Sequence, residues 1–274
     1  MDNHIIKLDK EKETLLVPLY GKAIESRKET PILIDSKALD IVEKIDYDFN
    51  SLKIPGKTNT MMCLRAKLID NFTNEFLINN PKTIVLHLGC GLDSRYSRID
   101  NTEVDWYDLD YKEVIAIRRH FFPETDKYHL ISSSVTEPGW IESIPTSEKP
   151  YLVIAEGLFM YLKEEEIKTL LNSVKRKVGH FTLIFDAYSV FTSKKVKNHP
   201  SIKKTGAKIY WGIDDPEDIL QWNSGIRFIK EIYFTSNEEI DNLGFGTRLG
   251  YKIAHIFPIA RKAQRIMIYE IGEA

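Results

Sequence analysis

The chain has 274 residues, a formal net charge of −2, and 43% hydrophobic against 28% charged residues. This composition excludes an intrinsically disordered chain, and the length suits one large α/β domain, alone or with a cap. The balanced charge gives no indication of a surface for nucleic acids or for anionic membranes.

No apolar run is long enough to span a bilayer, and the first residues lack the basic and apolar regions of a signal peptide. The two cysteines, Cys63 and Cys90, lie far apart and show neither a disulfide pattern nor metal-ligand spacing. We therefore expect a cytoplasmic protein in a reducing compartment, with no bound metal, no nucleic acid partner and no membrane partner. The sequence leaves the oligomeric state open.

Residues 13–80 have a mostly helical pattern, with breaks at Pro31 and at residues 54–56. Arg65 falls on the apolar face of the last of these helices. Burying an unpaired cation is costly, so Arg65 needs an anionic partner, and the simplest interpretation is an Asp or Glu of the chain itself. The apolar residues that share its face recur at helical spacing: Met61, Leu64, Leu68, Ile69, Phe72 and Phe76.

Strand and helix patterns alternate from residue 81 onward. Alternation of this kind predicts a parallel sheet with right-handed crossovers. The lysine-rich stretch 190–206 predicts an exposed loop or lid. Two late runs, 227–235 and 265–271, predict an antiparallel strand that closes the sheet. The earlier strands are predicted at 83–88, 104–110, 128–132, 151–156 and 181–186, and helices at 113–121 and 164–178.

The first predicted strand ends in a glycine loop, Gly89-Cys90-Gly91. Glycines let the backbone turn sharply and approach a ligand, and such a junction lies at the carboxyl ends of parallel strands. The loop lacks the third glycine of the G-x-G-x-x-G fingerprint, which weakens the interpretation of the chain as a nicotinamide-dependent enzyme. A tight turn without a ligand is the alternative.

Two acidic residues, Asp108 and Asp110, stand 17 and 19 positions after Gly91 at the end of the second strand. An acidic side chain here can accept hydrogen bonds from both hydroxyls of a ribose. Strand alternation places both on one face, and either of them could instead cap the following helix. The loop and the acid together predict a nucleoside cofactor, without distinguishing NAD from S-adenosylmethionine.

A third signal is the segment from Glu156 to Leu162, at the end of the fourth strand. Glu156 faces the same crevice as the glycine loop, and the hydroxyl of Tyr161 can reach it. The alternative is a helix-entry turn with Tyr161 in the core. We interpret His87 as a packed core residue of the first strand, because the histidines show no metal-ligand pattern.

In this order, the motifs resemble those of the leucine carboxyl methyltransferase family, which includes bacterial O-methyltransferases of the polyketide-tailoring type. Segments 18–27, 65–70, 85–95, 109–115 and 155–162 carry the resemblance, which spans roughly residues 15–185. It implies an α/β fold of the class I methyltransferase kind, with a Rossmann-like, mostly parallel seven-stranded sheet. It also implies a helical cap at 1–80, a cofactor domain at 81–274 and a lid inserted at about 188–224.

The resemblance implies S-adenosylmethionine as the cofactor. Arg65 would then pair with the carboxylate of its methionine part and Asp110 with the ribose, while Tyr161 would lie near the methyl-transfer site. Ser134-Val135 stands where many relatives carry Asp-Leu, which leaves the adenine to a serine hydroxyl or to the amide of Val135. The remaining cofactor contacts would come from Gly89, Cys90, Gly91 and Glu156.

The implied reaction is O-methylation of a carboxylate or hydroxyl on a small molecule, including a polyketide-like one, or on a protein. A carboxylate acceptor is already ionised, whereas a hydroxyl acceptor would use Glu156 or Tyr161 as a base. Two other hypotheses stay open here, a nicotinamide-dependent oxidoreductase and a non-catalytic S-adenosylmethionine-binding protein. Candidates for lining the acceptor pocket are Tyr210, Trp211 and Trp222.

Overall fold

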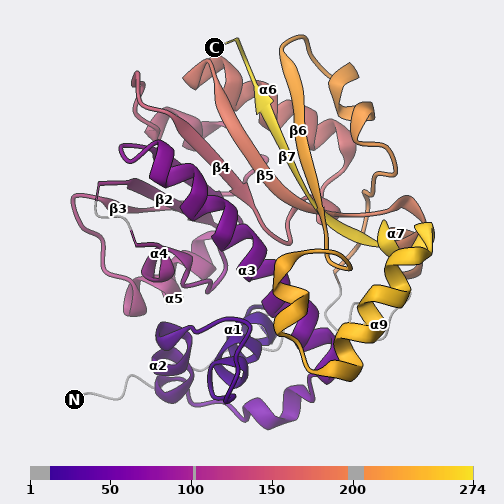
Figure 1. Ribbon diagram of the computed structural model, residues 1–274. Helices are drawn as coiled ribbons and strands as arrows, with labels where there is room; N and C mark the ends of the chain where they lie inside the picture. Colours follow the sequence, from indigo (N-terminus) through magenta and orange to yellow (C-terminus); the bar gives the residue numbers. More distant parts are fainter. Residues whose placement is uncertain (1–12, 101–102, 197–206, 274) are drawn as a thin grey trace.

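A seven-stranded sheet forms the centre of the computed structural model, which describes residues 13–100, 103–196 and 207–273 (Figure 1). The strand order is β3-β2-β1-β4-β5-β7-β6. Strands β1 to β5 pair in parallel, and β7 is antiparallel to both β5 and β6. The predicted mostly parallel sheet with an antiparallel closing strand is thus confirmed. The strands are β1 (Ile84–Leu88), β2 (Asp105–Asp110), β3 (Tyr128–Ser132), β4 (Tyr151–Ala155), β5 (Phe181–Tyr188), β6 (Ile226–Tyr233) and β7 (Gln264–Ile271).

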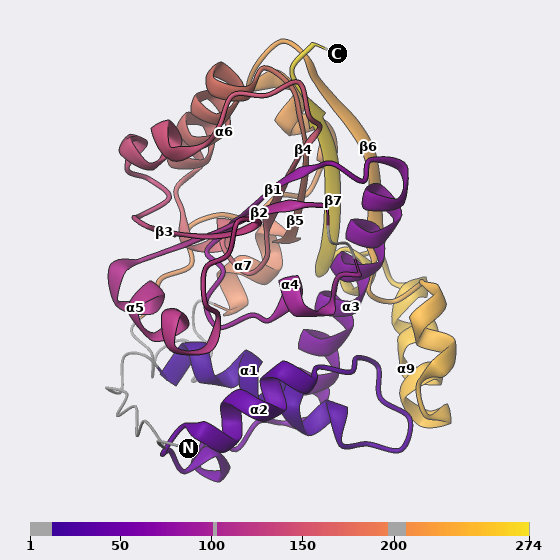
Figure 2. The same ribbon diagram turned by 90° about the vertical axis from the view of Figure 1, so that its left-hand side faces the viewer.

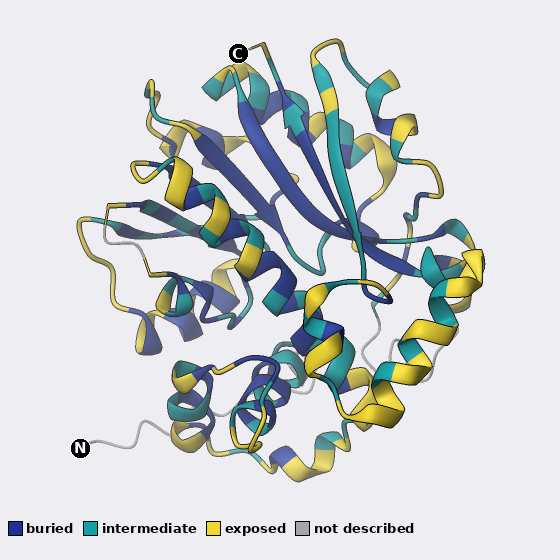
Figure 3. Ribbon diagram, viewed as in Figure 1, coloured by how far each residue is buried: buried dark blue, intermediate teal, exposed yellow. Residues whose placement is uncertain are grey.

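The core lies on both faces of this sheet, which is why the central strands are continuous apolar runs (Figure 3). Alternate residues of β1 contribute to different faces: Val85 packs with the N-terminal helices, and Leu86 packs with α6 (Glu164–Val178). Every residue of β1 and β4 is buried. The covered faces hold these strands in one register, so the loops at their carboxyl ends are fixed in place.

Three N-terminal helices, α1 (Glu13–Ser26), α2 (Ser36–Lys44) and α3 (Gly56–Asn79), are separated at the predicted breaks. Helices α1 and α2 lie beyond the carboxyl ends of the parallel strands, while α3 runs back along the sheet (Figures 1 and 2). The remaining α-helices are α4 (Arg95–Arg98), α5 (Lys112–Phe121), α7 (Val190–Val196), α9 (Phe245–Ile256) and α10 (Pro258–Arg261). None of the helices within the described ranges is long and apolar enough to cross a membrane.

The segment predicted as a lid, 188–224, begins with α7, and its lysine-rich residues 197–206 lie outside the described residues. Its second half is fixed to the sheet. The amide of Ile213 donates to the carbonyl of Tyr188 at 2.9 Å, and the guanidinium of Arg265 donates to the carbonyls of Ile213 and Asp214. A lid function for this segment stays a prediction.

Candidate active site

The glycine loop lies between the ends of β1 and β2, where its backbone requires glycine. Gly89 and Gly91 have φ angles of +64° and +52°, in the left-handed region that other residues rarely adopt. The amide of Cys90 donates to the carbonyl of Leu109 at 3.1 Å, which ties the loop to β2. A Cβ atom on Gly89 would come within 3.0 Å of the side chain of Leu158. Residue 89 therefore needs glycine for both conformation and space.

We expect Gly89→Ala to lower the free energy of unfolding by about 1–2 kcal/mol, because alanine is strained in the left-handed region. Urea denaturation measures the change. Gly139→Ala is the matched control, since it has a right-handed backbone and no heavy atom within 4 Å of the added Cβ. A Gly89→Ala protein as stable as the wild type would mean that the loop has a different conformation.

The two acidic residues at the end of β2 have different surroundings. The carboxylate of Asp110 accepts hydrogen bonds from the amides of Gly91 and Tyr111, both at 2.7 Å, and so lies against the glycine loop. Burial raises the pKa of Asp110 despite these two donors. Its position at the rim of the sheet fits the predicted ribose contact, which stays a prediction.

Asp108 is completely buried in a polar cluster beneath the loop. Its carboxylate pairs with the guanidinium of Arg118 and accepts hydrogen bonds from Tyr128 and, at 2.9 Å, from the indole of Trp106. Burial opposes ionisation, but Arg118 outweighs it and lowers the pKa of Asp108 to about 2. Because Asp108 has no exposed surface, we interpret it as a structural anion.

Arg65 extends from α3 to the carboxyl ends of β4 and β5. Its Nε donates to Glu156 Oε1 at 2.9 Å, and its Nη1 donates to Asp186 Oδ2 at 3.1 Å. The expected ion pair with an Asp or Glu of the chain is thus confirmed. No residue in the described part of the chain accepts a hydrogen bond from Arg65 Nη2. The predicted contact of the same guanidinium with a cofactor carboxylate is not tested by this geometry.

Asp186, at the end of β5, is a site residue that the sequence analysis did not identify. It is fully buried and accepts hydrogen bonds from the amide of Gly157 at 2.5 Å and from Gln264 at 2.9 Å, besides the one from Arg65. The signal available in the sequence was an acidic residue ending an apolar strand, as in β2. Asp186 fixes the position of both Arg65 and the turn after β4.

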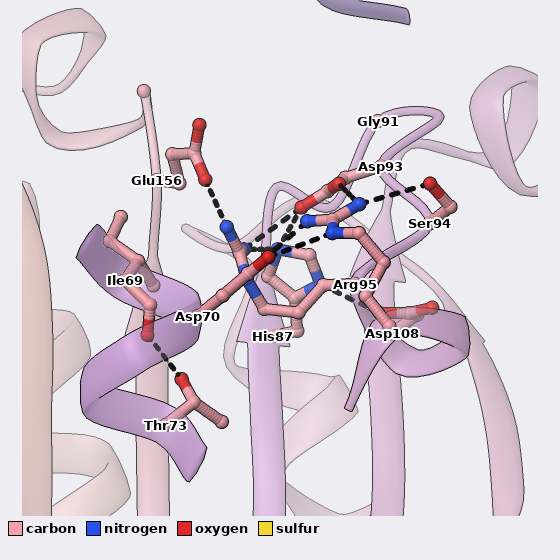
Figure 4. A network of polar contacts seen from close by, with 12 residues as sticks. Ile69, Asp70, Thr73, His87, Gly91, Asp93, Ser94, Arg95, Asp108 and Glu156 are labelled. Carbon is pink, nitrogen blue, oxygen red and sulfur yellow. Dashed lines mark hydrogen bonds and ion pairs between the residues drawn. The ribbon is translucent and has the colours of Figure 1, made fainter. Parts of the chain in front are cut away.

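A buried network of ion pairs connects the loop after β1 with α3 (Figure 4). The guanidinium of Arg95 is completely buried and contacts Asp70 at 2.6 Å, Asp93 at 2.9 Å and Glu156. His87 is buried, as expected of a core residue, but its neighbours are charged: it lies between Asp108 and Arg95. Further members of the network, also missed from the sequence, are Lys22, Asp35 and Arg98.

Protonation states at this site are set by burial and by these arginines. Burial opposes the ionisation of Glu156, but Arg65 and Arg95 outweigh it and lower its pKa to about 2. Burial raises the pKa of Tyr161, whose phenol is partly exposed, and raises that of Tyr188 to about 12. Near neutral pH the site therefore offers an ionised carboxylate and two protonated phenols.

The predicted adenine contacts, Ser134 and Val135, follow β3 in a turn. The hydroxyl of Ser134 lies 2.8 Å from that of Thr136, and the side chain of Val135 is buried beside Trp140. The carbonyl of Val135 accepts a hydrogen bond from the indole of Trp140 at 3.3 Å. The turn has a defined local structure, while its contact with adenine stays a prediction.

The three aromatic residues predicted to line an acceptor pocket have different surroundings. Trp211 and Trp222 line a cavity of about 500 Å³ beside the first turn of α6, whereas Tyr210 is largely exposed. Trp211 also packs against Phe185 in the core. Arg65 and Tyr161 are absent from the lining of this cavity. Of the three, only Trp211 is a buried core residue, and the contact of these residues with an acceptor stays a prediction.

Comparison with known families shows that the chain matches the model of the leucine carboxyl methyltransferase family over residues 16–175. This range contains most of α1, all of α2 and α3, the glycine loop, β2 and the Glu156–Tyr161 segment.

Individual proteins show the same similarity over most of the chain. The tetracenomycin polyketide synthesis O-methyltransferase TcmP of Streptomyces glaucescens is 37% identical over 81% of this chain and 83% of its own length. The S-adenosyl-L-methionine-dependent methyltransferase dpfgK of Gibberella zeae is 28% identical over 85% of each chain. A crystal structure of a candidate methyltransferase from Thermobifida fusca YX has the same fold, with a TM-score of 0.59 and 13% identity over 94% of this chain and 95% of its own.

Proposed function

The chain belongs to the leucine carboxyl methyltransferase family and is an S-adenosylmethionine-dependent O-methyltransferase, and from this premise we propose that its acceptor is the carboxylate of a small molecule. One observation carries this proposal: both oxygens of the Glu156 carboxylate accept hydrogen bonds from guanidinium groups, from Arg65 at 2.9 Å and from Arg95. These partners lower the pKa of Glu156 to about 2, and burial raises the pKa of Tyr161, so neither candidate base accepts a proton readily near neutral pH. A carboxylate acceptor is ionised at neutral pH and needs no base, whereas a phenol does.

A small acceptor is supported by the similarity to TcmP, whose name places that protein in polyketide synthesis. Because this relative matches 83% of its own length, a small polyketide-like acid is a better-supported acceptor than a protein carboxyl terminus.

The residues of the site fit the cofactor. The left-handed glycine loop brings residue 89 so close to the side chain of Leu158 that a Cβ atom would be tightly packed, and the carboxylate of Asp110 lies at the edge of the loop. We assign the methionine carboxylate to Arg65 and the ribose to Asp110. The remaining contacts are assigned to Gly89, Cys90, Gly91, Glu156 and the Ser134–Val135 turn.

When bound, the sulfonium cofactor supplies an electrophilic methyl group, and the contribution of the chain is to hold both partners in line. Glu156 and Asp186 fix two nitrogens of Arg65, so this side chain is positioned before a ligand arrives. Such positioning contributes up to roughly 7–11 kcal/mol in favourable cases. The charge of Arg65 opposes the effect of burial on the pKa values of Tyr161 and Tyr188, so both phenols lie near it. We assign their hydroxyls to orienting the acceptor.

Helices α1 and α2 lie at the site's end of the sheet, and α3 starts there (Figure 2). The segment 188–224 also begins at this end, after β5. We therefore assign residues 1–80 to a cap and 188–224 to a lid over a cofactor domain of residues 81–274. Both cysteines are free and buried, which supports our assignment of the protein to the cytoplasm.

The pH dependence of methyl transfer tests the acceptor proposal. We expect the rate with an aromatic carboxylic acid to change less than about twofold between pH 6 and 9, because the pKa of a carboxyl group, about 4, lies below this range. Glu156 and Tyr161 do not titrate in this range either, since their pKa values lie below and above it. Formation of S-adenosylhomocysteine from a panel of aromatic acids and matched phenols provides the measurement.

Tyr161→Phe is the matched variant for this experiment. With a carboxylate acceptor we expect it to raise KM and leave the flat pH profile unchanged. Transfer to phenols that increases about tenfold per pH unit, and is abolished by Tyr161→Phe, would contradict the proposal and identify Tyr161 as a base.

A further inference from the structure

Helix α9 has no buried residue, although half of its residues are apolar or aromatic. Together with α10 it presents six of the twelve large apolar side chains that are exposed in the described part of the chain. Phe245 and Ile256 are each 73% exposed. Folded monomers rarely leave such a contiguous apolar surface in water unless it binds something. The six residues, here called the α9 face, are Phe245, Leu249, Ile253, Ile256, Phe257 and Ile259.

The α9 face is one side of a helix whose other side contacts the rest of the chain. Phe245, Leu249, Ile253 and Ile256 follow one another at spacings of four, four and three residues, which places them on one stripe. The opposite side rests on the end of β6, where His255 lies 3.0 Å from the hydroxyl of Thr235. Figure 3 shows α9 as a largely exposed helix at the edge of the molecule.

Basic residues predominate in the stretch of the chain that carries the α9 face. No aspartate or glutamate occurs between Asp241 and Glu270, whereas Arg248, Lys252 and Lys262 fall in this interval. Lys252 pairs with Asp241 at 2.9 Å, and the guanidinium of Arg248 lies over the ring of Phe245. An apolar helix face bordered by basic residues is complementary to an anionic lipid surface, which offers both acyl chains and negative head groups.

A second copy of the chain is a poorer match. A two-fold contact through the α9 face brings Arg248 and Lys252 toward the same residues of the other helix. Lys252 is paired with Asp241, and the stretch from there to Glu270 holds no further carboxylate that could pair with Arg248. The net charge of −2 hides this local pattern, because the acidic residues that balance it lie elsewhere in the chain.

Helix α9 lies at the same end of the sheet as the glycine loop. It follows β6, which runs parallel to β5 because both are antiparallel to β7, and so α9 begins near the carboxyl ends of the parallel strands. Figures 1 and 2 show it at the end of the molecule that carries α1 and α2. A surface that binds α9 therefore also lies near the mouth of the active site.

We propose that the α9 face docks the enzyme on the surface of an anionic phospholipid membrane. The apolar side chains enter the boundary between head groups and acyl chains, and the basic residues face the phosphates. Docking of this kind is peripheral and reversible, and it does not depend on the identity of the methyl acceptor.

Flotation of the full chain with vesicles tests the proposal. We expect at least about tenfold tighter binding to vesicles of phosphatidylcholine and phosphatidylglycerol than to phosphatidylcholine alone, and weaker binding at high salt. Phe245→Ser/Ile256→Ser is expected to abolish binding. Ile78→Ser is the matched control, because Ile78 is 80% exposed at the end of α3, away from the α9 face.

Unchanged thermal unfolding of both variants shows that the chain remains folded. Absence of binding to either vesicle overturns the proposal, as does equal binding by Phe245→Ser/Ile256→Ser and the wild type. Sedimentation equilibrium tests whether a second copy binds the α9 face. A wild-type dimer that the Phe245→Ser/Ile256→Ser variant does not form would assign the α9 face to self-association and would also overturn the proposal. Cofactor binding, measured separately, stays unchanged in all variants, so failure of docking is distinguishable from failure of the proposed function.

Discussion

Asp110→Ala is expected to weaken the binding of S-adenosylhomocysteine by about 100-fold or more, because two ribose hydroxyls lose a charged acceptor worth about 1.5–3 kcal/mol per hydrogen bond. The carboxylate also accepts the amide hydrogen of Gly91, so the glycine loop loses a local constraint. Isothermal titration of the wild type and the variant measures the effect on affinity directly.

Asp105→Ala is the matched control for this experiment. Asp105 begins the same strand, and its carboxylate pairs with Lys127 at 2.9 Å and with Lys149 at 2.6 Å, both of which are partly exposed. We expect this variant to bind S-adenosylhomocysteine like the wild type, because exposed ion pairs contribute little. If Asp110→Ala were to bind as tightly as Asp105→Ala while both remained folded, Asp110 would not contact the ribose.

Asp108→Ala is expected to lower the free energy of unfolding by about 3–5 kcal/mol, the typical cost of leaving a buried arginine without its partner. Arg118 is completely buried and pairs with Asp108, which also accepts hydrogen bonds from Tyr128 and Trp106. Urea denaturation of both proteins at neutral pH measures the difference. The Asp108→Ala variant is expected to lose stability, whereas the Asp110→Ala variant is expected to lose mainly affinity for S-adenosylhomocysteine.

The stability difference should depend on pH with a defined sign. The pKa of Asp108 is lowered in the folded protein, from an ordinary value of 3.8 to about 2. A lowered pKa contributes stability that is fully present above pH 3.8 and is lost as the pH falls through about 2. The difference in the free energy of unfolding between the wild type and Asp108→Ala should therefore become smaller as the pH falls. A gap that widened in acid would contradict the assigned ionisation of Asp108.

Local signals in the sequence were sufficient for most of the fold. The buried strands are continuous apolar runs, and the amphipathic pattern of 164–178 coincides with α6. The glycine loop was visible because a left-handed backbone between a strand and its neighbour favours glycine. Arg65 was visible because a cation on an apolar helix face demands a partner. Periodicity and backbone preference depend on neighbours along the chain, so these features needed no coordinates.

Long-range contacts explain what the sequence did not show. Asp186 meets Arg65 across 121 positions, and Arg95 meets Glu156 across 61, so no local pattern could pair them. The α9 face was also hidden, because an amphipathic helix indicates a buried side without showing whether a neighbour covers it.

The sequence by itself determined the alternation of strands and helices, the glycine loop and the family of methyltransferases to which the chain belongs. Only the tertiary structure showed how the surroundings of Asp108 and Asp110 differ. Strand alternation places both on one face, and the difference is one of depth: Asp108 is surrounded by Arg118, Tyr128 and Trp106, whereas Asp110 lies at the glycine loop. Depth in a sheet depends on which distant side chains pack above a residue, and that is a property of the folded chain alone.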